Sequence, residues 1–557
     1  MSEFSDEIYQ VDTDRRDRVT KKLVLLFSVV LFIGSLFFFA YPEKKEEQPA
    51  ETLTAGALAG QVKEASRLYK RLAKTLEADQ VKLCFEGEEL ACDREQMIFY
   101  LPVDMDLEEW EAGTFSNVDD SIEILPMKDY TLLDKQETVA QGLQIPFLAW
   151  NREGGTCRKV YVAFTGLPVV KMETAADLDI DTVFAGAVSF YEACGQEDWV
   201  LTSVFEAHER GQTTRAYPKK GYRVNLVDVT STGISRKNKQ SVLGMRKSDS
   251  WIFYAIYSDG TKVRDKFNTE LWAGIGAEDT PYDAYFGTKM KYVELVVNGE
   301  YRGLYGIFEP VDKTQLAITD EEYLYKRTYG RALSRELFDS AGPDDYLTVL
   351  GMEIKGKKGN GTSLDWKQLR QFIAITEEED EEFAQDAQQL LDLDNVADIW
   401  IYLQFLYGED NIYKNMFFAF KKDTDGYQGY KLYLVPWDTD LTWGNVYVDS
   451  KEELYVKWAP ENADRYLEWP LLDRLIELDV GGIREKIKDR WTELRSGILS
   501  EESMNEIFTE CTHQVQDSGA FTRDAARWPD SRHDADYDGM KQFMKERTEF
   551  LDKMIQQ

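Results

Sequence analysis

Two short segments of the chain hold residues whose types and spacing could do chemistry. Residues 410–415 read DNIYKN and directly follow a hydrophobic stretch that predicts a buried helix. Residues 435–444 read VPWDTDLTWG and bring Asp438 and Asp440 to the predicted end of a strand. Carboxylates and amides are the ligands that hard cations such as Mg²⁺ or Mn²⁺ prefer. The two segments therefore predict a site in which carboxylates act beside a bound metal.

Asp410 and Asn415 have the spacing found in the catalytic loop of protein kinases, with Lys414 between them. In such a loop the Asp orients or deprotonates the substrate hydroxyl, and the Asn binds a metal ion. Phosphoryl transfer needs both, because the acceptor must be held in line and a cation must lie beside the phosphate charge. The spacing alone is common by chance, so it indicates this chemistry only together with other features.

Asp438 and Asp440 form the second half of the predicted site. Residues i and i+2 of a strand share a face, so both carboxylates are expected on one side, where they could chelate Mg²⁺ against the β- and γ-phosphates. An ordinary solvated turn is the alternative. The flanking Pro436, Trp437 and Trp443 favour a partly buried functional site, since unpaired carboxylates there would be costly.

Several motifs in order along the chain resemble the spore-coat CotH kinase family, an atypical protein-kinase-like family, over about residues Thr174 to Arg547. Residues 209–226 (ERGQTTRAYPKKGYRVNL) are similar to its RG-x-(S/T)-x…KK-x-(Y/F)-R segment. Residues 257–267 (YSDGTKVRDKF) and 297–313 (VNGEYRGLYGIFEPVDK) resemble its next two segments. The motif YLYKR at 323–327 follows where a strand with a Lys is expected. The DNIYKN and VPWDTDLTWG segments match its last two blocks.

The resemblance implies an α+β, protein-kinase-like domain that transfers the γ-phosphate of ATP to Ser or Thr of a cell-envelope or spore-coat-type protein. Asp410 becomes the catalytic Asp, with Lys414 beside it in the catalytic set. Asn415, Asp438 and Asp440 become ligands of Mg²⁺ or Mn²⁺.

Four further residues become candidates for binding ATP through the same resemblance. Lys220, or its neighbour Lys219, would neutralise the α- and β-phosphates, and Arg264 is a second phosphate candidate. Glu309 would orient the Lys or contact the nucleotide. Structural ion pairing is the alternative for these side chains. The chain has no Gly-rich phosphate loop, so side chains must hold the phosphates.

Composition limits the partners and the chemistry. The formal net charge is −35, which argues against nucleic acid as a partner and favours a basic protein as the substrate. The family resemblance implies that this substrate is also rich in Ser and Thr. The chain contains three histidines at no ligand spacing and no CxxC among its five cysteines. These features argue against a zinc site and against a Ser-His-Asp triad. Nothing in the sequence fixes the oligomeric state.

The N-terminal region predicts a membrane anchor. Residues 23–41 begin with LVLLFSVVLFIGSLFFFA, which has no charged residue and is long enough to cross a bilayer. Basic residues before it predict that residues 1–22 stay in the cytoplasm and that the main domain lies outside, with a single crossing. A cleaved signal peptide is the competing interpretation.

The rest of the chain is expected to be organised in three parts. Residues 42–80 form a stalk with a short helix over Gln61–Leu76, residues 81–173 an all-β, sandwich-like accessory module, and residues 174–557 the α+β kinase-like domain. Cys84 and Cys92 flank a predicted hairpin. They are either a disulfide pair or two ordinary strand cysteines.

Two other functions fit parts of the sequence. A non-catalytic adhesin or envelope-assembly protein could use the same fold, and ATP is scarce outside the cell. The presence of all of Asp410, Asn415, Asp438 and Asp440 favours catalysis. A glycosidase fits less well, because the two carboxylates of residues 438 and 440 are expected on one face and not across a sugar.

Overall fold

The computed structural model describes residues 53–174, 183–196, 198–211, 213–229, 235–276, 287–328, 333–340, 350–355, 366–448, 456–534 and 537–556. The chain forms two compact units. The first contains the described residues up to Ala255, together with Lys291–Ile307 and His513–Pro529. The second contains Ile256–Met290, Phe308–Thr512 and the described residues from Asp530 onward. The mixture of helices and sheets agrees with the predicted α+β class.

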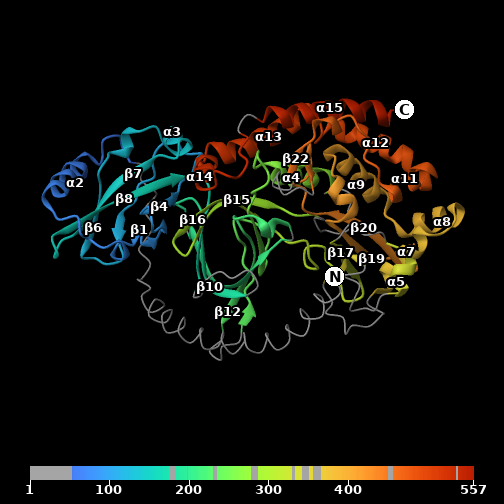
Figure 1. Ribbon diagram of the computed structural model, residues 1–557, viewed down its shortest axis with the longest axis horizontal. Helices are drawn as coiled ribbons and strands as arrows, with labels where there is room; N and C mark the ends of the chain where they lie inside the picture. The colour runs from blue at the N-terminus through green and yellow to red at the C-terminus, as the bar shows by residue number, and fades with distance from the viewer. Residues whose placement is uncertain are drawn as a thin grey trace. The chain divides into compact units, whose positions relative to one another are not determined.

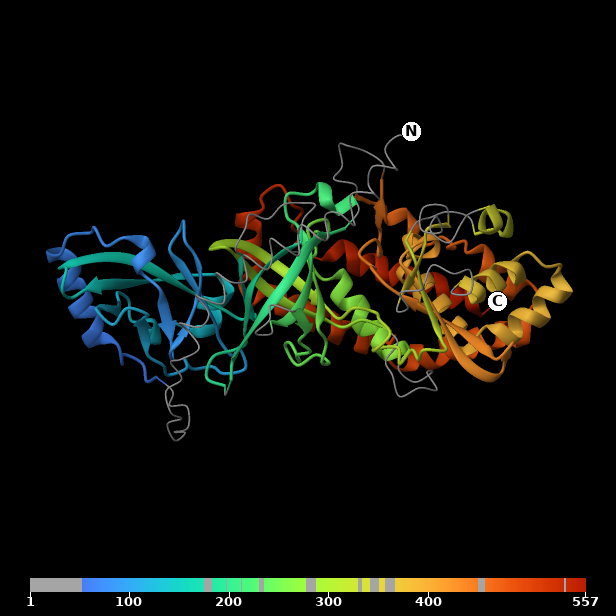
Figure 2. The ribbon, with the colours of Figure 1, turned by 90° about the horizontal axis from the view of Figure 1, so that it is seen from below.

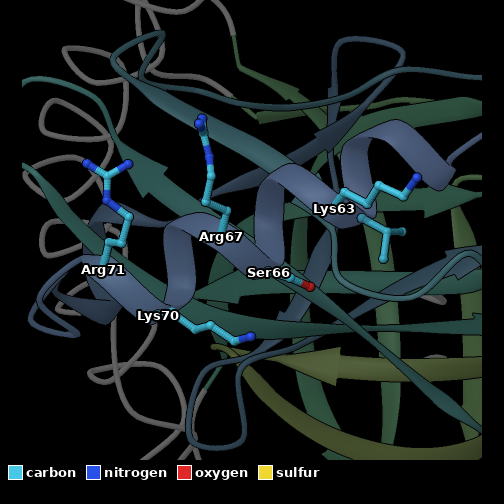
Figure 3. A pocket seen from close by; sticks show the side chains of 6 residues that line it. Lys63, Ser66, Arg67, Lys70 and Arg71 are labelled. Carbon is cyan, nitrogen blue, oxygen red and sulfur yellow. The ribbon is translucent and has the colours of Figure 1, made fainter.

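The first unit begins with helix α2 (Ala59–Arg71), which confirms the predicted short helix. Its apolar residues Ala65 and Leu68 are buried in a small cluster against β6 (Ile122–Pro126) and β7 (Gln144–Asn151). On the outer side the basic side chains of Lys63, Arg67, Lys70 and Arg71 extend away from the helix axis (Figure 3). The helix ends at Arg71 because Leu72 has an extended backbone.

Two small sheets follow α2 and share one apolar core. The five-stranded sheet has the order β3-β4-β8-β7-β6, and the three-stranded sheet has the order β2-β1-β5. Helix α3 (Lys135–Ala140), capped at its start by the side chain of Asp134, lies in the same stretch, so residues 81–173 are not purely β. The strands are β1 (Leu83–Phe85), β2 (Glu88–Glu89), β3 (Ala91–Asp93), β4 (Ile98–Pro102), β5 (Phe115–Asn117), β6 (Ile122–Pro126), β7 (Gln144–Asn151) and β8 (Thr156–Thr165).

The structure favours strand cysteines over the disulfide alternative for Cys84 and Cys92. The predicted hairpin is present as β1 and β2, but Cys92 lies beyond it on β3, which belongs to the other sheet. All five cysteines of the chain are free thiols. Burial raises the pKa of Cys84 to about 11 and that of Cys92 to about 12, so both thiols stay protonated at neutral pH.

The larger sheet of the first unit has eight strands in the order β11-β10-β9-β15-β16-β14-β12-β13. An additional pairing of β11 with β12 closes it on itself around an apolar core. The predicted hairpin turn at Asn298-Gly299 is confirmed, with φ of 53° and 75° as a tight two-residue turn requires. The strands are β9 (Val169–Thr174), β10 (Phe184–Tyr191), β11 (Val200–Arg210), β12 (Gly221–Val229), β13 (Ser235–Lys237), β14 (Ser250–Tyr254), β15 (Met290–Val297) and β16 (Glu300–Phe308).

The second unit is built on a four-stranded sheet of order β18-β17-β19-β20 (Figure 1). Its strands are β18 (Met352–Lys355), β17 (Tyr323–Arg327), β19 (Met416–Tyr427) and β20 (Tyr430–Pro436). The long β19–β20 hairpin, orange in Figures 1 and 2, confirms the predicted one and turns at Gln428-Gly429, both with positive φ. A short pair, β21 (Asn445–Tyr447) and β22 (Val456–Trp458), follows.

Helix α9 (Leu393–Leu406) lies at the centre of the second unit and confirms the predicted buried helix. It packs against β20, α4, α12 and α15 and is buried from Asn395 to Leu406. The Asp392 side chain caps its start, and Tyr407 ends it in a left-handed conformation with φ of 53°. The described helices that lie wholly or mostly in this unit are α4 (Arg264–Gly276), α5 (Arg335–Ser340), α7 (Lys367–Thr376), α8 (Asp380–Leu390), α9, α10 (Glu409–Tyr413), α11 (Pro470–Glu477), α12 (Ile483–Ser496), α13 (Glu501–Gln516) and α15 (Asp538–Ile555).

The predicted membrane segment, residues 23–41, lies outside the described residues. Among the helices that the structure does describe, none has both the length and the apolar character needed to cross a bilayer. The division of the chain at residue 173 also stays a prediction.

Candidate active site

The carboxylate of Asp410 is held by two side chains of its own loop. The loop follows α9 directly and includes the short helix α10. Asn415 donates a hydrogen bond of 2.7 Å from Nδ2 to Oδ2 of Asp410. Lys414 places Nζ 3.1 Å from Oδ1. Each oxygen of Asp410 therefore has a donor, and 16% of its side chain remains exposed to solvent.

The backbone of Asn415 connects this loop to the one that carries Asp438. The N–H of Asn415 donates to the carbonyl of Arg327 on β17, and its own carbonyl accepts from the N–H of Trp437 at 3.0 Å. The side chain of Asn411 donates to the Trp437 carbonyl at 2.8 Å. The two predicted segments are thus hydrogen-bonded to each other across the ends of β19 and β20.

Asp438 lies two residues beyond the end of β20, in a turn. Its φ is 60°, and that of Asn415 is 57°, so both side chains project from left-handed backbone. Asp and Asn tolerate this conformation better than most residues, and it clusters at functional sites where surrounding contacts hold it in place. The expectation that Asp438 and Asp440 share a strand face is wrong, because the strand ends at Pro436.

Helix α4 holds the Asp438–Asp440 turn from the other side. The Asp265 carboxylate accepts the N–H of Thr439 at 3.1 Å, and the Asn268 amide donates to the Thr439 carbonyl at 2.8 Å. Both side chains are buried. Sequence analysis did not single out either residue. The signal for Asp265 was its place in the segment 257–267 (YSDGTKVRDKF), which resembles a segment of the CotH kinase family.

Negative charge accumulates around Lys414. Burial raises the pKa of Asp410, and the nearby Asp438 adds to this while Lys414 opposes it. Burial also raises the pKa of Asp265 well above its usual range, followed by repulsion from Asp440 and Asp438. Burial lowers the pKa of Lys414, but Asp410, together with Asp438 and Asp440, outweighs this and raises the pKa overall. Each of these four aspartates therefore interacts electrostatically with another of the four or with Lys414.

This set of donors fits a hard divalent cation. Asp438, Asp440 and Asn415 offer oxygen ligands, and a cation would offset the excess negative charge. Within the described residues, no three His, Cys, Asp or Glu side chains are grouped closely enough to hold a metal by themselves. Water and phosphate oxygens would have to complete the coordination, as is usual for Mg²⁺ in phosphoryl-transfer sites.

Lys219 and Lys220 belong to the first unit, where both have partners. Lys219 is fully buried, and its Nζ lies 2.6 Å from Oδ1 of Asp524 on α14 (Ala520–Arg527) and from the carbonyl of Leu304. Lys220 donates at 2.6 Å to the carbonyl of Arg215. For Lys219 this is the structural ion pairing that sequence analysis left open, and a contact with phosphate stays a prediction for both.

Arg264 and Glu309 belong to the second unit and are both buried. Arg264, the first residue of α4, forms an ion pair with Asp259 and donates from Nε to the carbonyl of Thr442 at 3.2 Å. The backbone carbonyl of Glu309 accepts the hydroxyl of Thr288. Arg264 is therefore tied to the turn that follows Asp440, and its role toward phosphate stays a prediction.

A further cation of the second unit lies beside the site. Lys326, in the YLYKR strand β17, has Nζ 5.6 Å from the ring centroid of Trp437 and 5.5 Å from that of Phe417. A small cavity with room for about one water molecule lies between Asp265, Trp437 and Asp438. Lys326 was noted in the sequence as part of a strand but not as a site residue.

One of the comparisons with known proteins identifies a family. A family model for the CotH kinase protein matches residues 207–551, which is more than half of the chain and includes every candidate residue named above. A search of curated proteins finds no match.

Proposed function

The chain belongs to the CotH kinase protein family, and from this premise we propose that it is a kinase that transfers the γ-phosphate of ATP to Ser or Thr of a protein. The observation that carries the proposal is the placement of Asp410, with Lys414 and Asn415 on its two oxygens, beside the turn that holds Asp438. A base, a cation beside it and metal-type ligands are the parts that phosphoryl transfer requires.

Each residue has a defined part in the proposed reaction. The Ser or Thr hydroxyl loses its proton to Asp410 as its oxygen bonds to the γ-phosphorus, and the bond from that phosphorus to ADP breaks. Lys414 keeps the Asp410 carboxylate oriented and would offset negative charge that develops on the transferred phosphate. Asn415, Asp438 and Asp440 would hold Mg²⁺ or Mn²⁺, which when bound neutralises charge on the phosphates.

The protein substrate is proposed to be basic around its Ser or Thr. The chain has a net charge of −35, and the partly exposed carboxylates of Asp410, Asp438 and Asp440 gather at the proposed site. Such a surface attracts cationic segments and repels acidic ones. Matched peptides in which one Ser is flanked by Lys or by Glu test this directly. Equal rates on both would contradict the charge preference.

Transfer of labelled phosphate from ATP tests the activity itself. The full chain is incubated with ATP, with Mg²⁺ or Mn²⁺ and with a Ser/Thr protein mixture, beside an Asp410→Asn variant. Asp425→Asn, an exposed aspartate on the β19–β20 hairpin, is the matched control. Metal-dependent label is expected with wild type and the control and not with Asp410→Asn. Label that is equal in all three, or absent from all, would favour a non-catalytic adhesin or envelope-assembly protein.

We also propose that residues 23–41 anchor the chain in a membrane, with residues 1–22 in the cytoplasm and the main domain outside. The support is the uncharged segment with a basic flank before it. Reporters fused after Gln557 that are active on only one side of the membrane test the orientation. Activity restricted to the cytoplasm would refute it.

A further inference from the structure

The first turn of α4 presents two buried polar side chains to the turn between Asp438 and Asp440. Asp265 and Asn268 are three residues apart, so they share a helix face. Asp265 is 5% exposed and accepts two hydrogen bonds from Thr439, at 3.1 Å from the N–H and 3.3 Å from the hydroxyl. Both atoms of Thr439 that can donate therefore reach the same carboxylate oxygen.

Both polar atoms of the Asn268 side chain form hydrogen bonds with residues of the same turn. Its Nδ2 donates to the carbonyl of Thr439 at 2.8 Å and to the hydroxyl oxygen of Thr442 at 2.9 Å. Its Oδ1 accepts from Nε1 of Trp443 at 2.6 Å. Because an indole nitrogen only donates, this contact fixes which side of the amide is oxygen. Asn268 has no exposed surface and makes each of these bonds within the protein.

Together the two side chains hold Thr439 at both ends of its backbone. The peptide before Thr439 ends in the N–H that Asp265 accepts, and that peptide begins at Asp438. The peptide after Thr439 begins with the carbonyl that Asn268 binds, and that peptide leads to Asp440. Fixing both peptides fixes the directions in which the two carboxylates leave the backbone, including the left-handed residue Asp438.

Helix α4 is itself firmly placed in the second unit. The hydroxyl of Tyr402 on α9 donates to the Asn268 carbonyl at 2.9 Å. Arg264 at the helix start pairs with Asp259 and binds the Thr442 carbonyl. Burial raises the pKa of Asp259, but Arg264, together with Thr261 and Lys262, outweighs this and holds the pKa below its usual range, so the pair stays charged. The support behind Asp265 and Asn268 is thus rigid, as a positioning device requires.

We infer that Asp265 and Asn268 are positioning residues that hold Thr439 and so aim the carboxylates of Asp438 and Asp440 at the metal of the phosphoryl-transfer site. The inference deepens the proposed function and rests on it. Residues that orient metal ligands typically change metal affinity by about 10–100-fold when they are replaced. The same size of effect is expected here, without loss of the fold.

Four variants of the full chain separate positioning from other roles. Asp265→Asn keeps an acceptor for Thr439, whereas Asp265→Ala removes it. Asn268→Asp keeps the acceptor for Trp443 but loses both donors. Its added negative charge would by itself strengthen cation binding, so weaker binding cannot come from that charge. Glu270→Gln, on the same helix with a 41% exposed side chain, is the matched control.

Two measurements are made on each variant. The Mn²⁺ concentration for half-maximal phosphate transfer is expected to rise about 10-fold or more in Asp265→Ala and Asn268→Asp, and to stay within about twofold of wild type in Asp265→Asn and Glu270→Gln. Amide hydrogen exchange of residues 438–443 is expected to be faster in the first two variants alone, while the rest of the second unit keeps its protection.

The outcomes distinguish this inference from the proposed function. Equal losses in Asp265→Asn and Asp265→Ala would overturn it, because the charge and not the acceptor would then matter. Unchanged exchange of residues 438–443 in Asp265→Ala and Asn268→Asp would also overturn it. If wild type transfers no phosphate but those two variants alone exchange faster, the holding of Thr439 is supported while the proposed function fails.

Discussion

The side-chain amide of Asn415 donates a 2.7 Å hydrogen bond to Oδ2 of Asp410, five residues earlier in the same loop. This bond and the Lys414 contact on Oδ1 fix the plane of the carboxylate before any substrate is present. Asn415 has left-handed backbone, which turns its side chain back toward Asp410. A candidate base and a candidate metal ligand are therefore in direct contact. Replacing either residue is expected to change the orientation of the other side chain.

Replacement of Asp410 by Asn is expected to abolish most of the phosphate transfer. The amide keeps the size of the side chain but cannot accept the substrate proton, and loss of a general base usually lowers rates by about 10²–10⁴-fold. The KM for ATP is expected to change little, because Asp410 serves the acceptor hydroxyl. Initial rates at several ATP concentrations measure both quantities. A large rise in the KM for ATP with unchanged kcat would assign Asp410 to nucleotide binding instead.

Asp438→Asn is expected to weaken metal use in a way that more metal can partly overcome. Asn tolerates the φ of 60° at this position, so the variant removes a charge without adding backbone strain. The half-saturating Mg²⁺ concentration is expected to rise at least about 10-fold, because replacing a residue that only orients a metal ligand already lowers metal affinity by about that factor. Rates over a metal titration give this value, with Asp425→Asn as the control. A lower rate at unchanged half-saturation would argue against a ligand role.

The sequence predicted the parts of the site that lie close together in the chain. The loop from Asp410 to Asn415 and the turn with Asp438 were found because each fits within ten residues. The contacts that connect distant segments were not predicted. Asp265 reaches Thr439 across 174 residues, and Lys219 reaches Asp524 across 305 residues. Such pairs cannot be predicted from local spacing or periodicity, because the two residues are distant in the sequence and only the folded chain brings them into contact.

The same limit explains the errors in detail. The hairpin at Cys84 was recognised from its turn residues, but the start of a new strand at Ala91 moved Cys92 to another sheet. Asp438 and Asp440 were assigned to one strand face because they were placed at the end of a predicted strand, where residues i and i+2 share a face. The strand in fact ends at Pro436, and the left-handed backbone of Asp438 follows. The sequence thus predicted which segments form strands, but it did not predict the residues at which those strands begin and end.

Lys219 and Lys220 are expected to differ sharply when each is replaced by Met. Lys219→Met leaves the buried Asp524 without its cation, which typically costs about 3–5 kcal/mol of unfolding free energy. Lys220→Met loses a single partly buried hydrogen bond to a carbonyl and is expected to cost about 1 kcal/mol. Urea denaturation of the two variants measures the difference.

A double variant tests the cause of that loss. In Lys219→Met/Asp524→Asn the amide has no charge to bury but still accepts the Leu304 N–H, which Asp524 binds at 2.9 Å. Much of the lost stability is expected to return. If Lys219→Met instead abolished phosphate transfer at wild-type stability, Lys219 would be a phosphate ligand and not a structural cation.

Asp265→Asn is expected to stabilise the metal-free protein near neutral pH. The pKa of Asp265 is raised in the folded state, so its ionised form at pH 7 costs folding free energy that a neutral amide avoids. The advantage of the variant should shrink as pH falls through the folded pKa and disappear below the unfolded value of 3.8. Urea unfolding with a chelator across this pH range measures it. A pH-independent difference would show that Asp265 titrates normally.

The acidic limb of the pH–rate profile is expected to depend on Lys414. Transfer requires ionised Asp410, whose pKa is raised by burial, so the rate should fall at higher pH than for an exposed aspartate. Lys414 opposes that rise by favouring the ionised form. In Lys414→Met the pKa of Asp410 should therefore rise further, and the limb should move to higher pH.

Profiles of kcat for wild type and Lys414→Met test this, with Lys422→Met, an exposed lysine on β19, as the control. A limb that moves equally in both variants, or in neither, would mean that another group limits the rate at low pH.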